Sequence, residues 1–413
     1  MSKQAVYESA NVIIVGGGPA GMMTGLLLAR AGVSVAVLEK HGDFFRDFRG
    51  DTVHPSTMQL LDDLGLLGQF LARPHNRIDR AEIYWNDRLM QIGDLSHLAM
   101  PASFIAMMPQ WHFLDFLRDE AKKYRAFQLH MHAEVSELIE ESGQVAGVRL
   151  ADGREMRAGQ LVLMCDGRAS LARAILPVQS LGAPIDVFWF ALPKLAPGAA
   201  LRGVVHGRQL IVMIDRGDYW QCAFVIAKGE GAAIEARGIA DFHATVADAL
   251  HRAAPEEVAG LAAALPDFDR VHLLSVSLDR LERWHKPRLL AIGDAAHAMS
   301  PVGGIGINLA VQDAVCAANM LYAPLLERRP LTPYCAEIAA RRLLPTRIIQ
   351  GMQAAVHRNL LTPLMAGGVG ASDAPPMALR LLNRFALLRR VPGYFIGHGV
   401  RQERVTAPAA RQN

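Results

Sequence analysis

The sequence has little cysteine, little net charge and no long apolar segment that is free of charged residues and glycines. Its cysteines, Cys165, Cys222, Cys316 and Cys335, form no CxxC pair and are too sparse to staple a chain of 413 residues. A net charge of +3, with no basic stripe interleaved with aromatic residues, gives no signal for nucleic acid. We therefore expect a cytoplasmic globular protein with neither a disulfide framework nor a metal site.

The N-terminus lacks the apolar core and the small-residue cleavage site of a signal peptide. Residues 12–38 are apolar, but glycines and Arg30 interrupt them, so we expect no integral membrane segment. What the chain does have is enough hydrophobic residues, 51%, for a large two-lobed enzyme or for two to three domains. It also carries the tripeptide Arg-Gly-Asp at residues 49–51, which in a secreted protein would suggest an adhesion ligand.

The stretch "NVIIVGGGPAGMMTGLLLARAGVSVAVLEK" contains three glycines in GxGxxG spacing, Gly16, Gly18 and Gly21. A buried strand is predicted before them, a helix from Met22 to Ala31 after them, and a second strand ending at Glu39. In this context the first glycine permits a tight turn, the second lets the backbone approach a pyrophosphate, and the third lets the helix pack on the strand. The pattern predicts a dinucleotide site, with Glu39 on a ribose hydroxyl, and leaves NAD and FAD undistinguished.

Two further segments follow the same strand-then-loop pattern. "LVLMCDGRASLAR" predicts a strand from Leu161 to Cys165 that ends in Asp166-Gly167. "RLLAIGDAAHAMSPVGGIGINLAVQDAV" predicts a strand from Leu289 to Ile292 that ends in Gly293-Asp294, then a glycine-rich loop and a long helix from about Asn308. Aspartates could simply cap these turns, but their position at the ends of strands in an α/β sheet favours a ligand contact.

These three motifs, in this order, resemble the para-hydroxybenzoate hydroxylase family of single-component FAD-dependent aromatic monooxygenases over residues 10 to about 345. The resemblance implies an α/β fold: a Rossmann-like FAD-binding domain with an inserted antiparallel β-sheet substrate domain and a C-terminal helical segment. The expected parts are 1–75, 101–180 and 275–345 for FAD, 76–100 and 181–274 for substrate, and 346–413 for the helical region.

The resemblance also implies roles for individual residues. Asp294 would contact the FAD ribityl chain or ribose, and Asp166 would serve both FAD and the nicotinamide cofactor. The backbone of Gly306 and Ile307 would face the pyrimidine end of the flavin, where a helix N-terminus stabilises negative charge. Pro301 would lie near the oxygen-reactive carbon, and Arg49, in the first Arg-Gly-Asp, would contact FAD beside the moving ring; these two are the catalytic candidates. The remaining implied cofactor contacts are Ala20, Lys40, Gln110, Val135, Gly304 and Asn308. His297 is interpreted as structural.

Residues 185–227 consist of short β-branched and aromatic runs separated by turn signals, which predicts an antiparallel sheet. A second Arg-Gly-Asp, at residues 216–218, falls at a predicted hairpin turn, and residues 81–94 predict another hairpin. Trp189, Tyr219 and Gln221 are the substrate candidates, with Phe190 and Trp220 also considered. Their strand register is open, and a slip of one residue would reverse every assignment.

The C-terminal stretch "LRLLNRFALLRR" has helical spacing of leucines and arginines. We expect its leucine face to dock on the body of the protein, with contact to a membrane surface as the alternative.

The implied reaction is hydroxylation of a phenolic, quinolone-like or polyketide-like aromatic molecule with O2 through a flavin hydroperoxide, NADPH or NADH being the transient electron donor. Epoxidation, Baeyer–Villiger-type oxygenation and oxidoreduction without oxygen transfer stay open within the family, as does the choice between monomer and homodimer. A halogenase lacks support because no WxWxIP segment is present, and a disulfide-type reductase because no cysteine pair follows the first helix. An adhesion protein would leave all three motifs unexplained.

Overall fold

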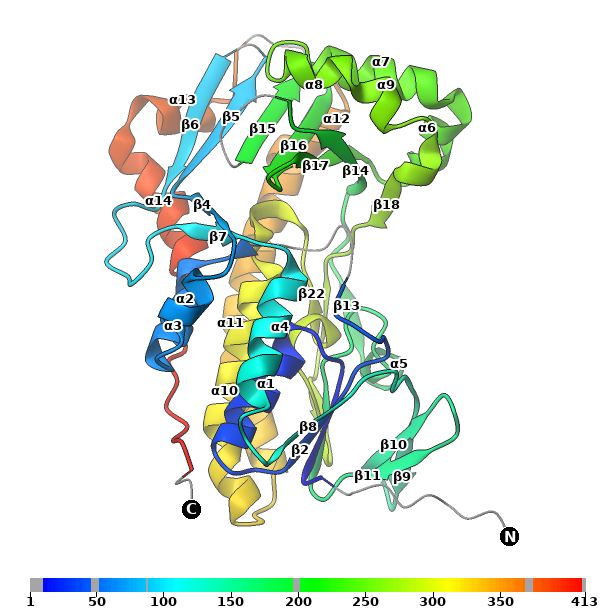
Figure 1. The fold of residues 1–413 in the computed structure, drawn as a ribbon, viewed down its shortest axis with the longest axis vertical. Helices are drawn as coiled ribbons and strands as arrows, with labels where there is room; N and C mark the ends of the chain where they lie inside the picture. Colours follow the sequence, from blue (N-terminus) through cyan, green and yellow to red (C-terminus); the bar gives the residue numbers. More distant parts are fainter. Residues whose placement is uncertain (1–9, 46–51, 87, 196–200, 368–373, 411–413) are drawn as a thin grey trace.

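The computed structural model describes residues 10–45, 52–86, 88–195, 201–367 and 374–410. It is a mixed α/β protein built around two large sheets, one in the lower and one in the upper part of Figure 1. All four cysteines are buried and unpaired.

The lower sheet has six strands, and its order places the predicted strands next to one another. From one edge to the other it contains β20 (His285–Lys286), β21 (Leu289–Ala291), β12 (Leu161–Met164), β1 (Val12–Val15), β2 (Val35–Leu38) and β8 (Phe127–His130). Strands β21 to β8 are parallel, and β20 alone pairs antiparallel. Every residue of β1, β2, β12 and β21 is buried, as the continuous apolar runs predicted.

Helices cover this sheet, and the predicted first helix is confirmed as α1 (Pro19–Arg30). It packs against α4 (Gln110–Ala121) and α10 (Gly306–Leu326), and α10 packs against α11 (Thr332–Val356). The segment Val302–Leu326 is long and apolar enough to cross a membrane, but 72% of its apolar window is buried inside the protein. Such burial is that of a core helix. Helices α2 (Pro55–Asp63) and α3 (Leu67–Leu71) lie beside this layer.

The upper sheet has seven strands and confirms the predicted hairpins. Its order is β18 (His272–Ser275), β14 (Ile185–Pro193), β17 (Tyr219–Ala227), β16 (Gln209–Asp215), β15 (Leu201–His206), β5 (Arg80–Trp85) and β6 (Arg88–Asp94). Only β15 and β5 run parallel. The second Arg-Gly-Asp forms the turn between β16 and β17, as predicted.

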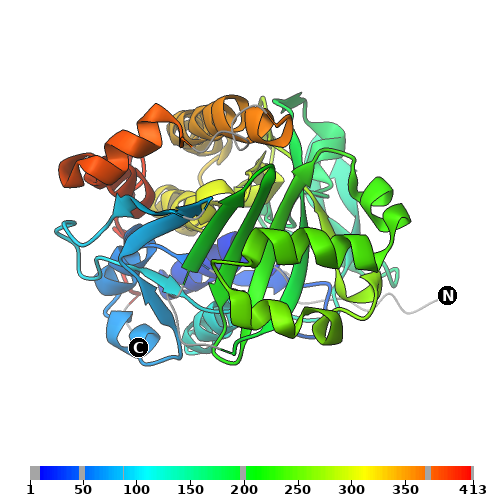
Figure 2. The same cartoon turned by 90° about the horizontal axis from the view of Figure 1, so that it is seen from above.

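The register of β14 and β17 resolves which strand face points inward. Even-numbered residues such as Phe188, Phe190 and Trp220 lie in an outer core. That core is covered by helices that the sequence analysis did not anticipate: α6 (Gly231–Arg237), α7 (Ile239–Leu250), α8 (Pro255–Ala259) and α9 (Leu261–Ala264). Figure 2 shows these green helices lying across the sheet. Odd-numbered residues such as Val187 and Ala223 instead form a second cluster with Leu361, toward the lower part of the molecule.

Three small sheets and several short helices complete the chain. The sheets are β11 (Glu155–Arg157), β10 (Gln144–Leu150) and β9 (Val135–Glu141); β13 (Val178–Ser180), β19 (Asp279–Leu281) and β22 (His297–Ala298); and β3 (Thr52–Val53), β7 (Ile105–Met107) and β4 (Asn76–Ile78). The short helical segments are α5 (Ala172–Ile175), η1 (Phe268–Arg270), η2 (Gly293–Ala295), η3 (Val302–Gly304), η4 (His357–Leu361) and α12 (Thr362–Met365).

The C-terminal helices α13 (Met377–Arg384) and α14 (Ala386–Gly397) pack against β6, and Leu379 of α13 packs on the hydrophobic cluster that contains Met90 of β6. The side of α14 that meets the protein carries Gly393 and Gly397, while Leu387 and Leu388 are exposed. The expected docking of the leucine face is therefore wrong for α14, whereas Leu379 of α13 does pack on the protein. Glycine on the inner side permits a close approach: a Cβ at Gly393 would lie 1.9 Å from the carbonyl oxygen of Asp94. The expected start of the C-terminal region, residue 346, falls within α11.

A buried carboxylate, Asp313 of α10, joins parts of the chain that are distant in sequence. It accepts hydrogen bonds from the backbone N–H of Gly293 at 3.1 Å and from Nε of Arg342 at 2.7 Å, and it lies 2.6 Å from Nε2 of His297. Burial would raise the pKa of Asp313, but His297 and Arg342 outweigh it and hold that pKa below its ordinary value. Arg342 in turn contacts Glu403 near the C-terminus.

We expect Asp313→Ala to lower the free energy of unfolding by about 3–5 kcal/mol, because it leaves the buried Arg342 with only its longer contact to Glu403, at 3.4 Å. Since the pKa of Asp313 is lowered in the folded protein, its contribution is present above the unfolded pKa and is lost as the pH falls through the folded value. Urea denaturation measures both effects. Asp241→Ala, which removes an exposed pair with Arg237, is the control and should change stability by less than about 0.5 kcal/mol. Equal stability of the two variants would contradict this reading.

Candidate functional site

Four of the predicted site residues lie along one edge of the six-stranded sheet. In the register of the parallel strands, Leu38, Val15, Met164 and Ala291 are neighbours. The residues that leave these strand ends are Glu39, Gly16, Asp166 and, two positions after Ile292, Asp294. Parallel strands place their carboxyl ends together, and this edge is where open α/β sheets bind ligands. The structure therefore brings the three motifs together at one edge.

The glycines of the first motif differ in what they meet. Gly16 has φ +102°, and a Cβ there would lie 2.4 Å from the carbonyl oxygen of Cys165. A Cβ at Gly21 would lie 2.0 Å from the carbonyl oxygen of Gly16. These two glycines are required by the packing of α1 on the sheet. Gly18 is different: a Cβ there meets no atom of the described chain within 4 Å.

Gly18 is the N-cap of α1, and no side chain of the described residues caps this helix end. The first N–H groups of a helix need partners, and its N-terminus attracts anions. An uncapped helix start beside open space is therefore suited to a phosphate group. Ala20, in the first turn of α1, is buried.

Glu39 is buried at the end of β2 and organises the loop beside α1. Its carboxylate accepts hydrogen bonds from the backbone N–H groups of Gly17 and His41, both at 3.0 Å, and lies 2.7 Å from Nδ1 of His41. The next residue, Lys40, is exposed. Val135 begins β9, two residues after Ala133, whose N–H donates to the carbonyl of Glu39. Glu39, Lys40 and Val135 thus belong to one neighbourhood, and their contacts with the cofactor stay predictions.

The two motif aspartates occupy different environments. Oδ2 of Asp166 accepts a hydrogen bond from the N–H of Leu171 at 3.2 Å, whereas Oδ1 is buried with no partner in the described part of the chain. Burial raises the pKa of Asp166, against the lowering effect of the hydrogen bond from Ser170. The Asp294 carboxylate is 37% exposed and lies 3.5 Å from Nε of Arg168.

Arg173, in the second motif, holds the third motif in place. Its guanidinium donates to the carbonyl oxygens of Asp294 at 3.0 Å and Ala295 at 3.2 Å, and it pairs with Asp279 at 2.6 Å. His297 lies in the core beside Asp313 with no exposed surface, which places it where a structural histidine is expected.

The loop before α10 contains Pro301, which is exposed, and Gly304, which has φ +61°. The carbonyl of Gly304 accepts a hydrogen bond from Oγ1 of Thr52 at 2.7 Å. Gly306 begins α10, and Ile307 follows it in the first turn. The helix N-terminus thus opens beside the glycine loop, as the motif predicted.

The side chain of Asn308 holds neighbouring segments together, a structural role that was not predicted from the sequence. Its Oδ1 accepts hydrogen bonds from the N–H of His54 and from Oγ1 of Thr57, both at 2.8 Å, and its Nδ2 donates to the carbonyl of Thr52 at 3.2 Å. The amide therefore ties β3 and α2 to the start of α10. Arg49, which precedes β3, lies outside the described residues, and its assignment stays a prediction.

A cavity of about 560 Å³ lies between the end of the upper sheet and the start of α4. Among its lining residues are Tyr219 and Gln221, two of the substrate candidates, and Trp111, the neighbour of Gln110. Trp189 shares the inner face of β14 but does not line this cavity. Phe190 and Trp220, also considered, point into the outer core, which excludes them from this wall.

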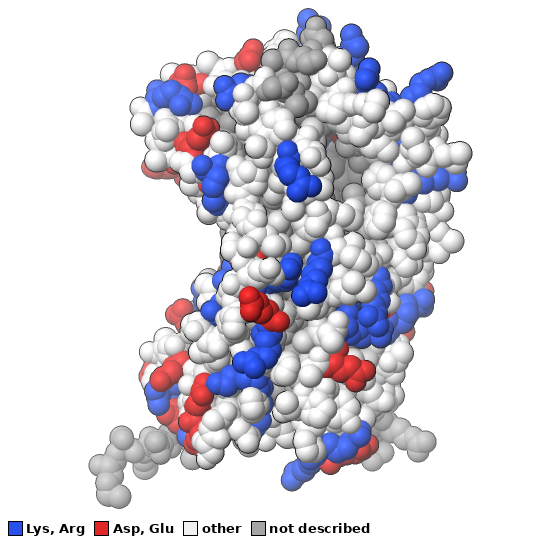
Figure 3. All heavy atoms as spheres, turned by 180° about the vertical axis from the view of Figure 1, so that it is seen from behind, with Lys and Arg blue, Asp and Glu red and all other residues white. Residues whose placement is uncertain are grey.

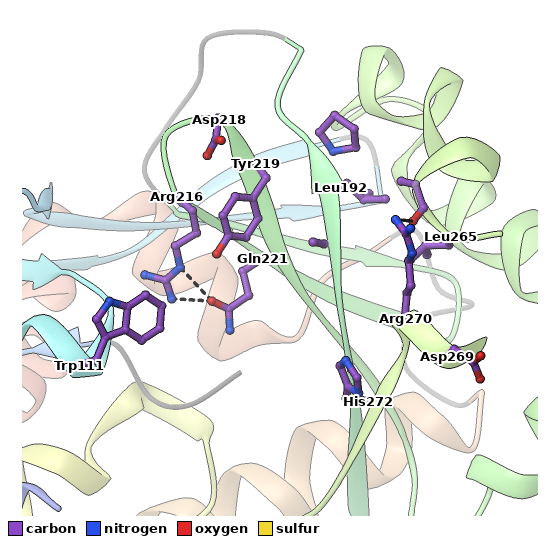
Figure 4. Close-up of a pocket in the computed structure, with 13 residues that line it drawn as sticks. Trp111, Leu192, Arg216, Asp218, Tyr219, Gln221, Leu265, Asp269, Arg270 and His272 are labelled. Carbon is purple, nitrogen blue, oxygen red and sulfur yellow. Dashed lines mark hydrogen bonds between the residues drawn. The ribbon is translucent and has the colours of Figure 1, made fainter. Parts of the chain in front are cut away.

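Arg216 and Trp111 were missed by the sequence analysis. The Arg216 guanidinium donates twice to Oε1 of Gln221, at 2.8 Å and 2.6 Å, and Figure 4 shows it between Trp111 and Gln221. Burial lowers the pKa of Arg216 to about 10, which leaves it charged at neutral pH. The cavity wall therefore carries a positive charge held by an amide between aromatic side chains.

The residues at the strand-end edge fit FAD on observations independent of the motifs. Among the residues that the structure describes, none fills the space beside Gly18, none caps the start of α1 with its side chain, and none donates to the buried Oδ1 of Asp166. Each is a feature that a dinucleotide with phosphates and hydroxyl donors would satisfy.

We expect Gly18→Ala to weaken FAD binding about tenfold, or about 1.4 kcal/mol, because the added methyl group takes space needed by the pyrophosphate. Its folding stability should stay within about 0.5 kcal/mol of the parent, since the Cβ contacts no described protein atom. Equilibrium titration of the apoprotein with FAD measures the first effect. Gly68→Ala, in α3, adds a methyl group that is equally free of contacts and should leave FAD binding unchanged. Equal affinity in both variants would remove Gly18 from the site.

Comparison with known proteins agrees with this geometry. The family described as FAD binding domain matches residues 9–334. The chain is 31% identical over 390 residues to 6-methylpretetramide 4-monooxygenase of Streptomyces rimosus, covering 93% of this chain and 90% of that protein. It is 27% identical to rifampicin monooxygenase of Streptomyces venezuelae, covering 97% and 79%.

Among solved structures, p-nitrophenol 4-monooxygenase PnpA of Pseudomonas putida has the same fold, with a TM-score of 0.75, 20% identity and coverage of 96% of this chain and 99% of that one. The family match and the relatives confirm the resemblance seen in the motifs, and with it FAD as the cofactor. The chain belongs to the FAD binding domain family and is an FAD-dependent aromatic monooxygenase.

Proposed function

We propose that this enzyme hydroxylates a polycyclic phenolic substrate of polyketide type, using O2 and NADPH or NADH. The cavity beside Trp111 carries the proposal, because its volume of about 560 Å³ suits a multi-ring molecule. Its wall combines apolar and aromatic side chains with six polar or charged ones, which are Arg216, Asp218, Gln221, Asp269, Arg270 and His272. The relative of Streptomyces rimosus, named for 6-methylpretetramide, supports this substrate class.

In the proposed layout the six-stranded sheet with α1 and α10 forms a Rossmann-like FAD-binding domain, and the seven-stranded sheet is the inserted substrate domain. Gly18 and the start of α1 would hold the pyrophosphate, Glu39 the adenosine ribose, and Asp294 the ribityl chain. Gly306 and Ile307 would face the flavin ring, with Pro301 beside it. Gln110 and Arg49 would complete the cofactor contacts. We further propose a cytoplasmic location, with a monomer or homodimer as the active form.

When bound and reduced, FAD supplies the activation of O2 that hydroxylation requires. The chain's own part is to place the substrate ring, exclude water and stabilise charge. Trp111 and Tyr219 offer aromatic surface for the ring. The Arg216 guanidinium, held by Gln221, would stabilise negative charge on a phenolic oxygen, which makes the ring more electron-rich. The antiparallel sheet above the strand-end edge would shield the reaction from water.

The test of this function is an assay of the purified protein. We expect a flavin absorption spectrum, NAD(P)H oxidation that a polycyclic phenol accelerates, and a product one oxygen atom heavier whose added atom comes from 18O2, detected by mass spectrometry. A protein that cannot be reconstituted with FAD would refute the assignment. NAD(P)H oxidation that yields only hydrogen peroxide across a panel of phenols would refute the substrate class.

Arg216→Ala should lower kcat/KM for the phenolic substrate by about 10²-fold, the effect of losing one donor that stabilises developing charge. The flavin spectrum should not change, because Arg216 is assigned to the substrate and not to FAD. Steady-state NAD(P)H oxidation and product yield measure the loss. Arg237→Ala, on the exposed surface of α6, is the charge-matched control. An unchanged kcat/KM in Arg216→Ala would remove this residue from the substrate site.

A further inference from the structure

The outer side of the C-terminal helices is unusually apolar. Eight of the nineteen large hydrophobic side chains that are exposed in the described part of the chain fall between residues 377 and 395. We call them, together with Arg380, Arg384 and Arg390, the apolar–basic patch; the eight are Met377, Leu381, Phe385, Leu387, Leu388, Val391, Tyr394 and Phe395. The most exposed are Leu387 at 70%, Met377 at 67% and Val391 at 54%.

The patch follows from the orientation of α14. At 100° per residue, Tyr394, Leu387, Val391, Phe395 and Leu388 fall within one arc of about 120° on this helix. The opposite side carries Gly393, Gly397 and Arg389 and faces β6, where Arg389 donates to the side chain of Gln91. Apart from Ile396, which packs on the cluster that contains Leu95 and Leu98, the helix turns its large apolar residues outward and its glycines inward. A surface helix of a soluble protein normally does the reverse.

The charges of this segment have one sign. From residue 374 to 400 the sequence contains no aspartate or glutamate. Two nearby acids of the β5–β6 hairpin have partners of their own: Asp94 accepts hydrogen bonds from Ser96, and Glu82 accepts one from Gln91. Figure 3 shows the region of α13 and α14, at the upper right in this rear view, as white and blue without red. The partner for this surface should therefore be apolar and negatively charged.

A second copy of the chain is a poor partner for the apolar–basic patch. A two-fold dimer places the same patch on itself, so arginines would face arginines with no acid in the segment to separate them. An anionic lipid surface meets both requirements at once, because acyl chains accept the apolar arc and headgroup phosphates pair with arginines. We propose that the apolar–basic patch docks the enzyme on an anionic lipid bilayer.

The experiment uses the FAD-loaded, full-length protein and sedimentation with vesicles. We expect it to bind vesicles containing phosphatidylglycerol and to bind vesicles of pure phosphatidylcholine at least tenfold more weakly. Raised salt should weaken the binding to anionic vesicles, because it screens the arginines. Replacing Arg380, Arg384 and Arg390 together by alanine should reduce the preference for anionic lipid by about fivefold for each arginine.

The decisive variant is Leu387→Asp with Val391→Asp, which should lower partitioning to anionic vesicles at least tenfold. Leu344→Asp with Ile348→Asp is the matched control: it has the same residue spacing, lies on the exposed side of α11 and adds the same charge. Flavin absorbance and far-UV circular dichroism confirm that all variants are folded. Vesicle binding is measured without substrate, so the result does not depend on the identity of the aromatic substrate.

Three outcomes would overturn the proposal. The first is equal binding to anionic and neutral vesicles, or no binding to either. The second is an equal loss in the control pair, which would place the contact elsewhere. The third is a dimer, seen by light scattering without lipid, that Leu387→Asp with Val391→Asp dissociates; the patch would then be an interface between copies.

Discussion

The Asp313 carboxylate is the interaction on which the arrangement of the site depends. It binds the N–H of Gly293, where the third motif leaves the sheet, and it contacts His297 four residues later. On its other side Arg342 brings in α11 and the segment around Glu403. Burying charges is costly, and such a cluster persists only when its members satisfy one another. Here Asp313 contacts both His297 and Arg342 at the base of the loop that presents Asp294, so the position of that loop is set from the interior.

The sequence predicts those parts of the site in which the backbone geometry of a single turn or strand end requires one residue type. Gly16 and Gly21 are needed because any side chain would collide with backbone, and that requirement appears directly as spacing. The strand-end positions of Glu39, Asp166 and Asp294 follow from apolar runs and from the rule that parallel strands share an edge. The helix start at Gly306 is equally local. Fold class and cofactor edge are therefore readable from the sequence.

The residues that line the cavity come from segments far apart in the sequence, so they could not be predicted from local sequence patterns. Trp111 and Arg216 come from α4 and a hairpin turn, more than a hundred residues apart, and meet only after the upper sheet has formed. The inner face of β14 and β17 also depends on the helices α6–α9, which cover the opposite face and bury Phe190 and Trp220. Alternation alone shows two faces but does not show which one another layer will cover. The second Arg-Gly-Asp, at residues 216–218, thus contributes its arginine to the wall of this cavity.

The C-terminal helices illustrate the same limit with a different consequence. Periodicity indicated one helix over this stretch, which the structure divides at Phe385 into α13 and α14. It also gave no means of choosing which side of a helix would meet the protein. Strand β6 lies at the edge of the sheet, where backbone N–H and C=O groups lack a neighbouring strand. Helix α13 packs there, and the side chain of Asn383 accepts a hydrogen bond from the N–H of Gln91. Close contact there demands a side of minimal size, which Gly393 provides and a leucine could not. Protecting the sheet edge thus forces the leucines of α14 outward.

An exposed apolar surface of this extent is a liability in water unless another surface covers it. The same helix can therefore close a sheet edge on one side and bind lipid on the other.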